Sequence, residues 1–419
     1  MDDRTGTTKI TAPPPVAPSQ AQSANRDGAA LRRRFPTIDY LRRRARWHIP
    51  NFAFEYGDGG AGSDKGIACN WAALDAVELV PRYGVMPALP PVSVELFGRR
   101  YAAPLGIAPM GGPALIWPGA DRYMAQAAQA SRVPYVLGTV GGLTIEDAAT
   151  IAPDVLWFQL YRLARNDHQL GFEIVRRADA AGVHVLVMTM DVPVRTTRPR
   201  EVVVGLGGGK FSPDLRMILD MLRSPGWLNS LWKNGHPRFA NLRPYAGEGA
   251  RLNDVIRFAR DEMGGAFTWE EVARFRDRWK RPLVLKGIMH PADAEKALSL
   301  GVDGIWVSNH GGRQIEALPA SIDVLPAIVA EVGHRATVIL DSGVRSGTDV
   351  ARALALGAHA AFAGKAFLWG LGALGEQGPR HVIDLLIDET RAALGQIGAH
   401  TPADARSVVI RHPGALPFP

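Results

Sequence analysis

The amino-acid sequence predicts an α/β protein folded as a (β/α)8 TIM barrel. Short apolar segments recur along the chain with amphipathic stretches between them, and eight such strand–helix units indicate a closed parallel sheet. An open doubly wound sheet is the alternative, but no G-x-G-x-x-G motif follows the first segment. The predicted strands are 105–108, 135–137, 156–160, 185–189, 283–286, 305–308, 338–341 and 360–363.

The part of the chain before the barrel divides into a tail and a helical segment. Residues 1–30 are rich in Pro, Ala, Ser and Gln, which predicts a disordered tail. A helical pattern starts at Thr37 and breaks at Pro50, and glycines then predict a loop over 57–62. We therefore expect one barrel domain over residues 31–413.

The formal net charge of +7 is concentrated near the N-terminus. Residues 1–47 hold ten Lys/Arg and four Asp/Glu, which leaves the remainder close to neutral. A solvated, arginine-rich helix face accounts for this segment, so we expect no nucleic-acid partner, although a charge-driven nucleic-acid- or lipid-binding protein is the rival class. No apolar run of about 18 residues and no signal peptide is present, which predicts a cytoplasmic protein.

Two further features concern the surface. The single cysteine, Cys69, excludes an intrachain disulfide, and we predict that it is a buried small hydrophobe. The gap after the fourth predicted strand holds an insertion, about 202–245, that mixes Leu, Ile, Met and Trp with Arg and Lys. It fits a lid, a subunit contact or an interfacial membrane anchor.

Polar residues at or just beyond the strand ends indicate a site, because buried polar groups are costly without partners. Lys286 ends a strand and needs an anion; it would either form a Schiff base or stabilise a reduced cofactor ring. Glycines with one cation each, Arg345 and Lys365, follow the last two strands, where barrels often bind the phosphate of a substrate or a nucleotide.

The stretch 305–314, I-W-V-S-N-H-G-G-R-Q, places a base beside an anion clamp. His310 is suited to proton transfer, and Arg313 is suited to hold a carboxylate. Asp191, just beyond the fourth strand, is placed to orient His310. Arg198 either joins Arg313 around a substrate carboxylate or is a solvated charge. The pattern favours chemistry on a small organic acid.

The motif S-N-H-G-G-R-Q at 308–314 resembles the signature of the FMN-dependent α-hydroxy-acid oxidases and dehydrogenases, which include glycolate oxidase, L-lactate dehydrogenase and mandelate dehydrogenase. Segments 158–161, 283–287 and 341–345 resemble other motifs of that family, and the similarity runs from about residue 40 to 409. The resemblance implies a barrel that holds FMN over its strand ends. We expect no metal site.

The resemblance also implies residue roles. His310 would be the catalytic base, paired with Asp191, and Lys286 would lie beside flavin N1 and O2. The substrate would contact Tyr56, Tyr161, Arg198 and Arg313. The other implied cofactor contacts are Gln159, Thr189 and Ser308 at the isoalloxazine; Ala108, Pro109, Met110 and Gly111 behind N5; Gly138 beside the flavin; Asp341, Ser342 and Gly343 at the ribityl chain; and Arg345, Gly364 and Lys365 at the phosphate.

The sequence departs from the family pattern at three positions. Lys365 replaces the usual arginine, which keeps the charge but loses the planar fork. Gly138 replaces a common serine, so that a flavin hydrogen bond is lost or supplied by water. Gly111 is typical of mandelate dehydrogenase-like members and favours a dehydrogenase. The insertion near 223–235 resembles that of membrane-associated bacterial lactate dehydrogenases and supports the membrane interpretation.

We predict oxidation of an (S)-2-hydroxy acid, L-lactate- or mandelate-like, to the 2-keto acid. His310 would take a proton, and two electrons would reach FMN as hydride or through a carbanion; both routes stay open. A quinone or similar acceptor would reoxidise the flavin, and the alternative is an oxygen-using oxidase that produces hydrogen peroxide. We expect a homotetramer with peripheral contact to the inner face of the cell membrane through 202–245.

Overall fold

A computed structural model describes residues 28–85, 88–194, 196–206 and 212–418. The chain divides into two units, Met1–Pro36 and Thr37–Pro419. In the first unit, residues 28–34 are helical. The predicted tail therefore lies outside the described residues except for its last three, which are in this helix.

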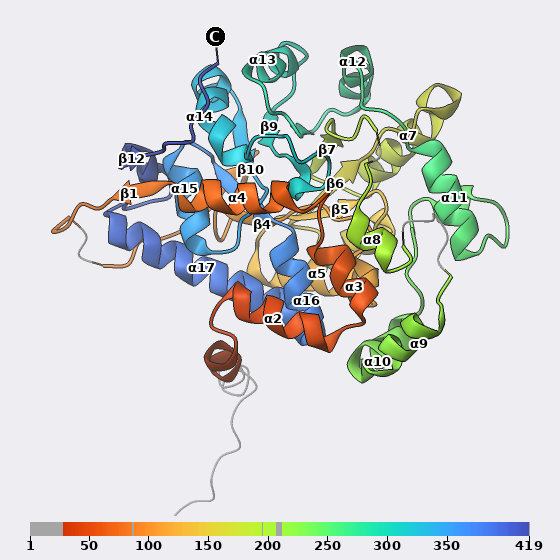
Figure 1. The fold of residues 1–419 in the computed structure, drawn as a ribbon. Coiled ribbons are helices and arrows are strands. Elements are labelled where there is room, and N and C mark those ends of the chain that lie inside the picture. The colour runs from red at the N-terminus through yellow and green to blue at the C-terminus, as the bar shows by residue number, and fades with distance from the viewer. Residues whose placement is uncertain (1–27, 86–87, 195, 207–211, 419) are drawn as a thin grey trace, which may run out of the picture. The chain divides into compact units, whose positions relative to one another are not determined.

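The second unit contains a closed barrel of eight parallel strands, which confirms the predicted fold class (Figure 1). The strands follow one another around the barrel in the order β10-β11-β4-β5-β6-β7-β8-β9. All are buried throughout except for the first residue of β10, as expected for continuously apolar strands covered by helices. They are β4 (Leu105–Ile107), β5 (Tyr135–Gly138), β6 (Leu156–Leu160), β7 (Val185–Thr189), β8 (Leu283–Lys286), β9 (Gly304–Val307), β10 (Thr337–Leu340) and β11 (Ala360–Ala363).

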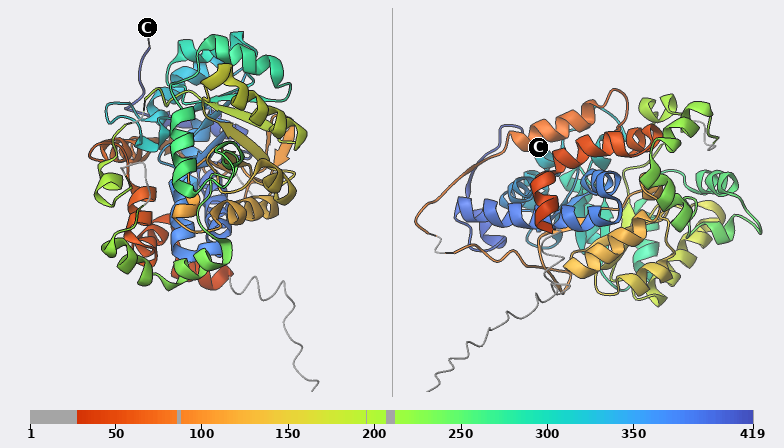
Figure 2. Two further views of the ribbon diagram at one scale, coloured as in Figure 1. Left: turned by 90° about the vertical axis from the view of Figure 1, so that its right-hand side faces the viewer. Right: turned by 90° about the horizontal axis from the view of Figure 1, so that it is seen from below.

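Helices surround these strands (Figures 1 and 2). Several begin at the N-caps that the sequence supplies: the side chains of Thr144, Thr268 and Ser346 each accept a hydrogen bond from a backbone N–H three residues on. The helices that follow the barrel strands are α5 (Ala120–Ser131), α6 (Ile145–Ile151), α7 (Arg165–Ala180), α12 (Trp269–Arg278), α13 (Pro291–Ser299), α14 (Ser321–Val332), α15 (Gly347–Ala355), α16 (Lys365–Leu374) and α17 (Gly378–Ile397). Short 3-10 turns are η1 (Pro113–Leu115), η4 (Gly375–Gln377) and η5 (Ala403–Ser407).

Among the described residues of the second unit, three helices precede the barrel strands: α2 (Ile38–His48), α3 (Asn51–Asp58) and α4 (Lys65–Asp75). The break at Pro50 separates α2 from α3, as predicted, but α3 extends into the first two residues of the predicted glycine loop. The prediction of a buried Cys69 was wrong, because this residue is exposed on α4. The buried residues of α4 lie on another face of the helix.

The segment between β7 and α12 is helical: it contains α8 (Pro199–Val203), α9 (Leu215–Leu222), α10 (Pro225–Asn234), η2 (Arg243–Tyr245) and α11 (Leu252–Glu262). Residues 207–211 of the predicted insertion lie outside the described part of the chain. Helices α9 and α10 contact each other, and α9 also contacts α3 (Figure 1). The additional helical segment between β7 and α12 extends through α11, whereas the insertion was predicted to end near residue 245.

Large rings fill the barrel below its carboxyl rim. The ring of Phe362 lies 5.4 Å from that of Trp157 and 4.6 Å from that of Trp306. A hairpin of β2 (Val94–Leu96) and β3 (Arg99–Tyr101) contributes Tyr101, whose hydroxyl accepts a hydrogen bond from Trp157 Nε1 at 3.0 Å. The remaining pair of strands, β1 (Glu78–Val80) and β12 (Val409–Arg411), is antiparallel and lies outside the barrel.

This packing leaves no space at Gly106, where a Cβ atom would lie 2.5 Å from the ring of Phe362. We expect Gly106→Ala to lower the free energy of unfolding by about 1–3 kcal/mol, because the rigid ring has to shift. Chemical denaturation measures this. Phe362→Leu should lower the free energy of unfolding less in the Gly106→Ala variant than in the wild type. Gly264→Ala, where nothing lies within 4 Å, is the control and should be close to neutral.

Candidate active site

The strand register brings polar side chains together at the carboxyl rim. Gly138 pairs with Gln159, and Thr189 pairs with Lys286, on neighbouring strands. The Gln159 amide donates a hydrogen bond to the Thr189 hydroxyl at 2.8 Å, and both side chains are buried. The predicted strand-end residues therefore form one buried polar surface at the barrel mouth.

Lys286 is the buried cation of this surface. Its Nζ donates to Ser308 Oγ at 2.8 Å and lies 3.4 Å from Asp341 Oδ2. Burial lowers the pKa of Lys286, but the carboxylates of Asp341 and Asp191 outweigh it, so that the pKa lies above its ordinary value. A lysine that stays protonated is a poor nucleophile, which favours charge stabilisation over Schiff-base chemistry.

The loop after β9 contains the 3-10 turn η3 (His310–Gly312), in which His310 has a φ of 60°. Side chains hold this strained backbone in place. Ser342 Oγ accepts hydrogen bonds from the N–H groups of Asn309 at 3.2 Å and Gly311 at 3.0 Å. The amides of Asn309 and Asn70 exchange two buried hydrogen bonds, at 2.9 and 2.7 Å. Sequence reasoning missed Asn70, whose partner lies 239 residues away.

The histidine and its expected carboxylate do meet: His310 Nδ1 lies 3.0 Å from Asp191 Oδ1. Because an ionised carboxylate only accepts, Nδ1 carries the hydrogen and Nε2 is left as a proton acceptor. Burial raises the pKa of Asp191, but His310 and Lys286 outweigh it and keep the pKa below its ordinary value. Gly287, at a φ of 97°, allows this approach, since a Cβ there would lie 2.4 Å from that of Asp191.

The two arginines also come together. Arg198 Nε donates to the backbone oxygen of Arg313 at 3.3 Å, so Arg198 belongs to the site and is not a solvated charge. Arg313 Nη1 donates to the backbone oxygens of Tyr56 at 2.9 Å and Gly59 at 2.8 Å. One residue that sequence reasoning missed, Glu201, accepts from both guanidinium groups. Its position three residues after Arg198, at the start of a helix, was the available signal.

Two tyrosines complete this end of the cavity. Tyr56 Oη donates to the backbone oxygen of Gly111 at 2.6 Å. Burial raises the pKa of both Tyr56 and Tyr161, and the Asp191 carboxylate adds to the effect on Tyr161. Both phenols therefore keep their protons near neutral pH, and that of Tyr56 is donated to Gly111.

Arg345 and Lys365 line the same cavity, but Lys365 Nζ and Arg313 Nη1 donate to the same backbone oxygen, that of Gly59, at 2.8 Å each, so Lys365 lies beside the arginine pair. Arg345 pairs with Asp75 and Asp349, whereas Lys365 Nζ donates to three backbone oxygens at the end of α3, at 2.8–3.1 Å. Burial, followed by repulsion from Arg313, holds the pKa of Lys365 well below its ordinary value. An anion bound beside this amine would favour its charged form.

One cavity is lined by His310, by the arginine pair and by both predicted phosphate cations, Arg345 and Lys365. Its buried Lys286 and the glycines of its lining fit a flavin nucleotide, which needs a cation beside the ring and close backbone approach along the chain. The predicted residues that line it are Tyr56, Ala108, Pro109, Met110, Gly111, Tyr161, Arg198, Lys286, His310, Arg313, Asp341, Ser342, Gly343, Arg345, Gly364 and Lys365. Gly138, Gln159, Thr189, Asp191 and Ser308 lie just behind, in contact with these residues or with each other.

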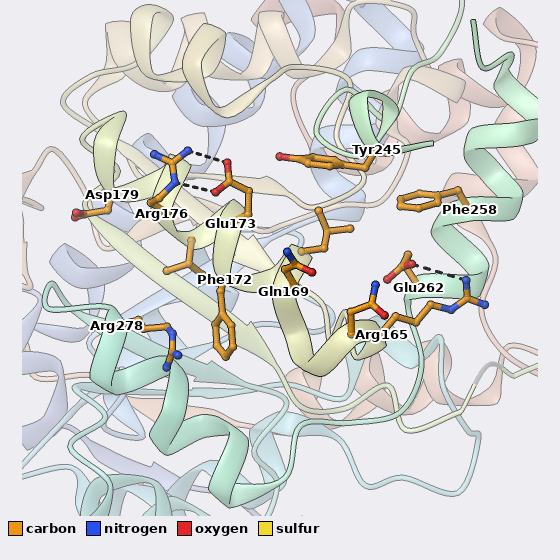
Figure 3. Close-up of a pocket in the computed structure, with 13 residues that line it drawn as sticks. Arg165, Gln169, Phe172, Glu173, Arg176, Asp179, Tyr245, Phe258, Glu262 and Arg278 are labelled. Atoms are coloured by element: carbon orange, nitrogen blue, oxygen red, sulfur yellow. Dashed lines mark hydrogen bonds and ion pairs between the residues drawn. The ribbon is translucent and has the colours of Figure 1, made fainter. Parts of the chain in front are cut away.

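A second hollow lies between α7 and α11 (Figure 3). Its charged groups neutralise one another: Arg176 forms two hydrogen bonds with Glu173, at 2.7 and 2.8 Å, and Arg165 lies 3.8 Å from Glu262. The residues that line it include none of the predicted site residues. The chemistry therefore belongs to the barrel mouth.

A barrel whose mouth combines a protonated buried lysine, a histidine–aspartate pair, two arginines and phosphate-type cations defines a flavin-dependent oxidoreductase. The sequence model of the family described as FMN-dependent dehydrogenase matches residues 45–412. The chain belongs to this family, binds FMN and oxidises a 2-hydroxy acid. The predictions of family, cofactor and reaction are confirmed.

Individual relatives agree with this assignment. The chain is 36% identical over 375 residues to an L-lactate dehydrogenase of Caulobacter vibrioides, which covers 89% of this chain and 97% of that protein. It is 36% identical over 363 residues to an L-lactate dehydrogenase of Pseudomonas syringae, covering 86% and 94%. The crystal structure of the monotopic membrane protein (S)-mandelate dehydrogenase superimposes with a TM-score of 0.85 at 31% identity, over 90% of this chain and 99% of that chain. A mandelate oxidase superimposes with a TM-score of 0.76 at 31% identity, with the same coverage.

A buried carboxyl group supports the loop beside Gly138. Asp121 accepts hydrogen bonds from Tyr135 Oη at 2.9 Å and from the N–H of Gly142 at 2.7 Å. Burial raises the pKa of Asp121 to about 6, only partly offset by these bonds. Because the folded-state value exceeds the unfolded one, the stability contributed by this group is present at low pH and is lost as the pH rises through about 6.

We expect Asp121→Asn to remove this dependence. Between about pH 4 and 7 the wild type should lose on the order of 1–3 kcal/mol relative to the variant, as measured by denaturant unfolding of the FMN-loaded protein. Asp261→Asn, a change at an exposed carboxylate, is the control and should follow the wild type. Parallel pH profiles for wild type and Asp121→Asn would contradict the assignment.

Proposed function

We propose that His310 is the catalytic base in the oxidation of an (S)-2-hydroxy acid, with Arg198 and Arg313 holding the substrate carboxylate. The observation that carries this proposal is the 3.0 Å contact between His310 Nδ1 and Asp191, in the cavity that both arginines line. The free Nε2 takes the substrate proton, and the Asp191 carboxylate stabilises the imidazolium that forms. Tyr161 supplies its O–H group to the substrate oxygens, and Tyr56 does so on giving up its hydrogen bond to Gly111.

FMN, when bound, accepts the two electrons of the oxidation. The chain's own contribution at that point is electrostatic. Lys286 holds a positive charge in a buried position, which would stabilise negative charge on a ring bound in this cavity. The backbone of 108–111 lines the same cavity and would help to hold the ring.

The relatives support two substrate classes, because the sequence relatives are L-lactate dehydrogenases and the structural relatives act on mandelate. We propose an L-lactate- or mandelate-like acid, with a quinone as electron acceptor. The exposed apolar helix described below supports the quinone, since a quinone resides in lipid. An anaerobic panel of 2-hydroxy acids, monitored by loss of the flavin absorbance, identifies the acid. Reoxidation by a quinone analogue, compared with air, then separates a dehydrogenase from an oxidase.

The variant His310→Ala tests the base. We expect it to lower the rate of flavin reduction by about 10²–10⁴-fold or more in anaerobic stopped flow, while the protein keeps its yellow FMN. His334→Ala, at an exposed histidine outside the cavity, should react like the wild type. Rapid bleaching of His310→Ala by the substrate would show that another group takes the proton.

We propose that the insertion contacts the membrane surface through α9. Its exposed residues Leu215, Ile218, Leu219 and Leu222 are spaced as one helical face, while Met217 is buried. Nearby cations on α9 and α10, and an 84% exposed Trp232, fit an interface that meets anionic headgroups and acyl chains. The (S)-mandelate dehydrogenase relative is a monotopic membrane protein. No helix in the described part of the chain is long and apolar enough to span a bilayer.

The double variant Leu219→Glu/Leu222→Glu tests this surface. We expect it to abolish co-sedimentation with vesicles that contain anionic lipid, because two carboxylates then face the headgroups. Turnover with a water-soluble acceptor should persist. Val409→Glu, at an exposed residue of β12, should not change the binding. Undiminished sedimentation of the double variant would refute the proposed contact.

The predicted homotetramer, the cytoplasmic location and the domain limits remain predictions. Light scattering of the purified FMN-loaded protein measures the number of subunits.

A further inference from the structure

The arginine pair of the active site already shares a carboxylate of the chain itself. Arg313 Nη2 lies 2.6 Å from Glu201 Oε1, and Arg198 Nη1 lies 3.3 Å from the same oxygen. The three side chains are 15–26% exposed, so this contact is partly shielded from water. A carboxylate oxygen between two guanidinium groups is what the proposed function expects of the substrate.

The charges of this cluster explain why an anion is held there. Burial and then repulsion from Arg198 lower the pKa of Arg313. The other contacts of Arg313 Nη1 are neutral backbone oxygens. Glu201 therefore neutralises one of the two arginine charges in the absence of a ligand and occupies the guanidinium N–H groups that a substrate carboxylate would use. A second carboxylate bound to the same arginines would be repelled by it, since like charges in a partly shielded site raise each other's energy.

The position of Glu201 on a short helix allows its side chain to move. Helix α8 has five residues and none of them is buried. Its Arg200 is anchored separately, by ion pairs to Glu55, Asp58 and Asp64. The Glu201 side chain can therefore rotate away from the arginines while α8 stays attached to α3. A side chain at a weakly packed helix is the kind of element that moves at low cost.

We propose that Glu201 is an internal competitor for the substrate carboxylate, displaced when a 2-hydroxy acid binds. This rests on the proposed function of Arg198 and Arg313. The competition lowers the apparent affinity for every acid, because only the fraction of molecules with Glu201 displaced can bind it. It also selects for charge: a carboxylate can replace Glu201 on the arginines, whereas a neutral amide of the same acid cannot.

The test compares FMN-loaded wild type with Glu201→Gln. Pyruvate and benzoylformate, 2-keto acids that are not oxidised, are titrated by calorimetry, and lactamide serves as the neutral analogue. We expect Glu201→Gln to lower Kd for at least one keto acid by about tenfold and to leave weak lactamide binding unchanged. KM for the 2-hydroxy acid should fall similarly with little change in kcat. Glu201→Asp, which is shorter by one methylene, should give a smaller decrease in Kd if the glutamine variant does not fold.

A matched control separates competition from general loosening of α8. Glu55→Gln removes the same charge as Glu201→Gln. The Glu55 side chain pairs with Arg200 of α8, but it forms no ion pair with Arg198 or Arg313. It should leave Kd unchanged. An unchanged or higher Kd in Glu201→Gln, with keto acids binding the wild type normally, would overturn the competitor role and show that Glu201 positions the arginines. If no keto acid binds the wild type or Glu201→Gln, and no 2-hydroxy acid bleaches the flavin, the proposed function is refuted as well.

Discussion

The buried ammonium of Lys286 is the constraint on which the barrel mouth depends. A cation removed from water needs anionic and hydroxyl partners, and Lys286 finds them on the two strands that follow its own, at Ser308 and Asp341. Ser308 Oγ also accepts a hydrogen bond from the N–H of His310 at 3.0 Å. The charge that we propose to stabilise a reduced ring and the turn that holds the proposed base are therefore organised by one cluster. Closing the barrel in this register is what brings the partners together.

A second set of interactions organises the end of α3. Lys365 and Arg313 both donate to its last backbone oxygens, which carry the negative end of the helix dipole. The Asp58 carboxylate at the same helix end pairs with Arg42 of α2 and Arg200 of α8. Cations from four separate segments therefore meet at one helix terminus. Because Lys365 and Arg313 share the backbone oxygen of Gly59, a residue predicted at the cofactor phosphate lies next to a residue predicted at the substrate carboxylate.

The sequence predicted the structure best where the pattern of neighbouring residues determines which element forms. Each barrel strand lies within one residue of its prediction, because strands covered on both faces are continuous apolar runs. Lys286 was found because it ends a strand, and His310 because it follows a strand in a stretch that also holds Arg313. Asn70 was missed because its partner lies 239 residues away. Glu201 was missed although Arg198 lies three residues before it, because its other partner, Arg313, is 112 residues away. Cys69 was misplaced because a small thiol has no pattern that separates a buried helix face from an exposed one.

That exposed thiol has a practical consequence. Cys69 is the only cysteine of the chain, so a maleimide dye would attach at a single position. Its neighbour Asn70 is hydrogen-bonded to Asn309, which immediately precedes the turn that contains His310. A fluorophore on α4 would therefore stand one residue from the amide pair that anchors this turn. The wild-type chain thus offers an optical reporter of loop movement during turnover, without any engineered site.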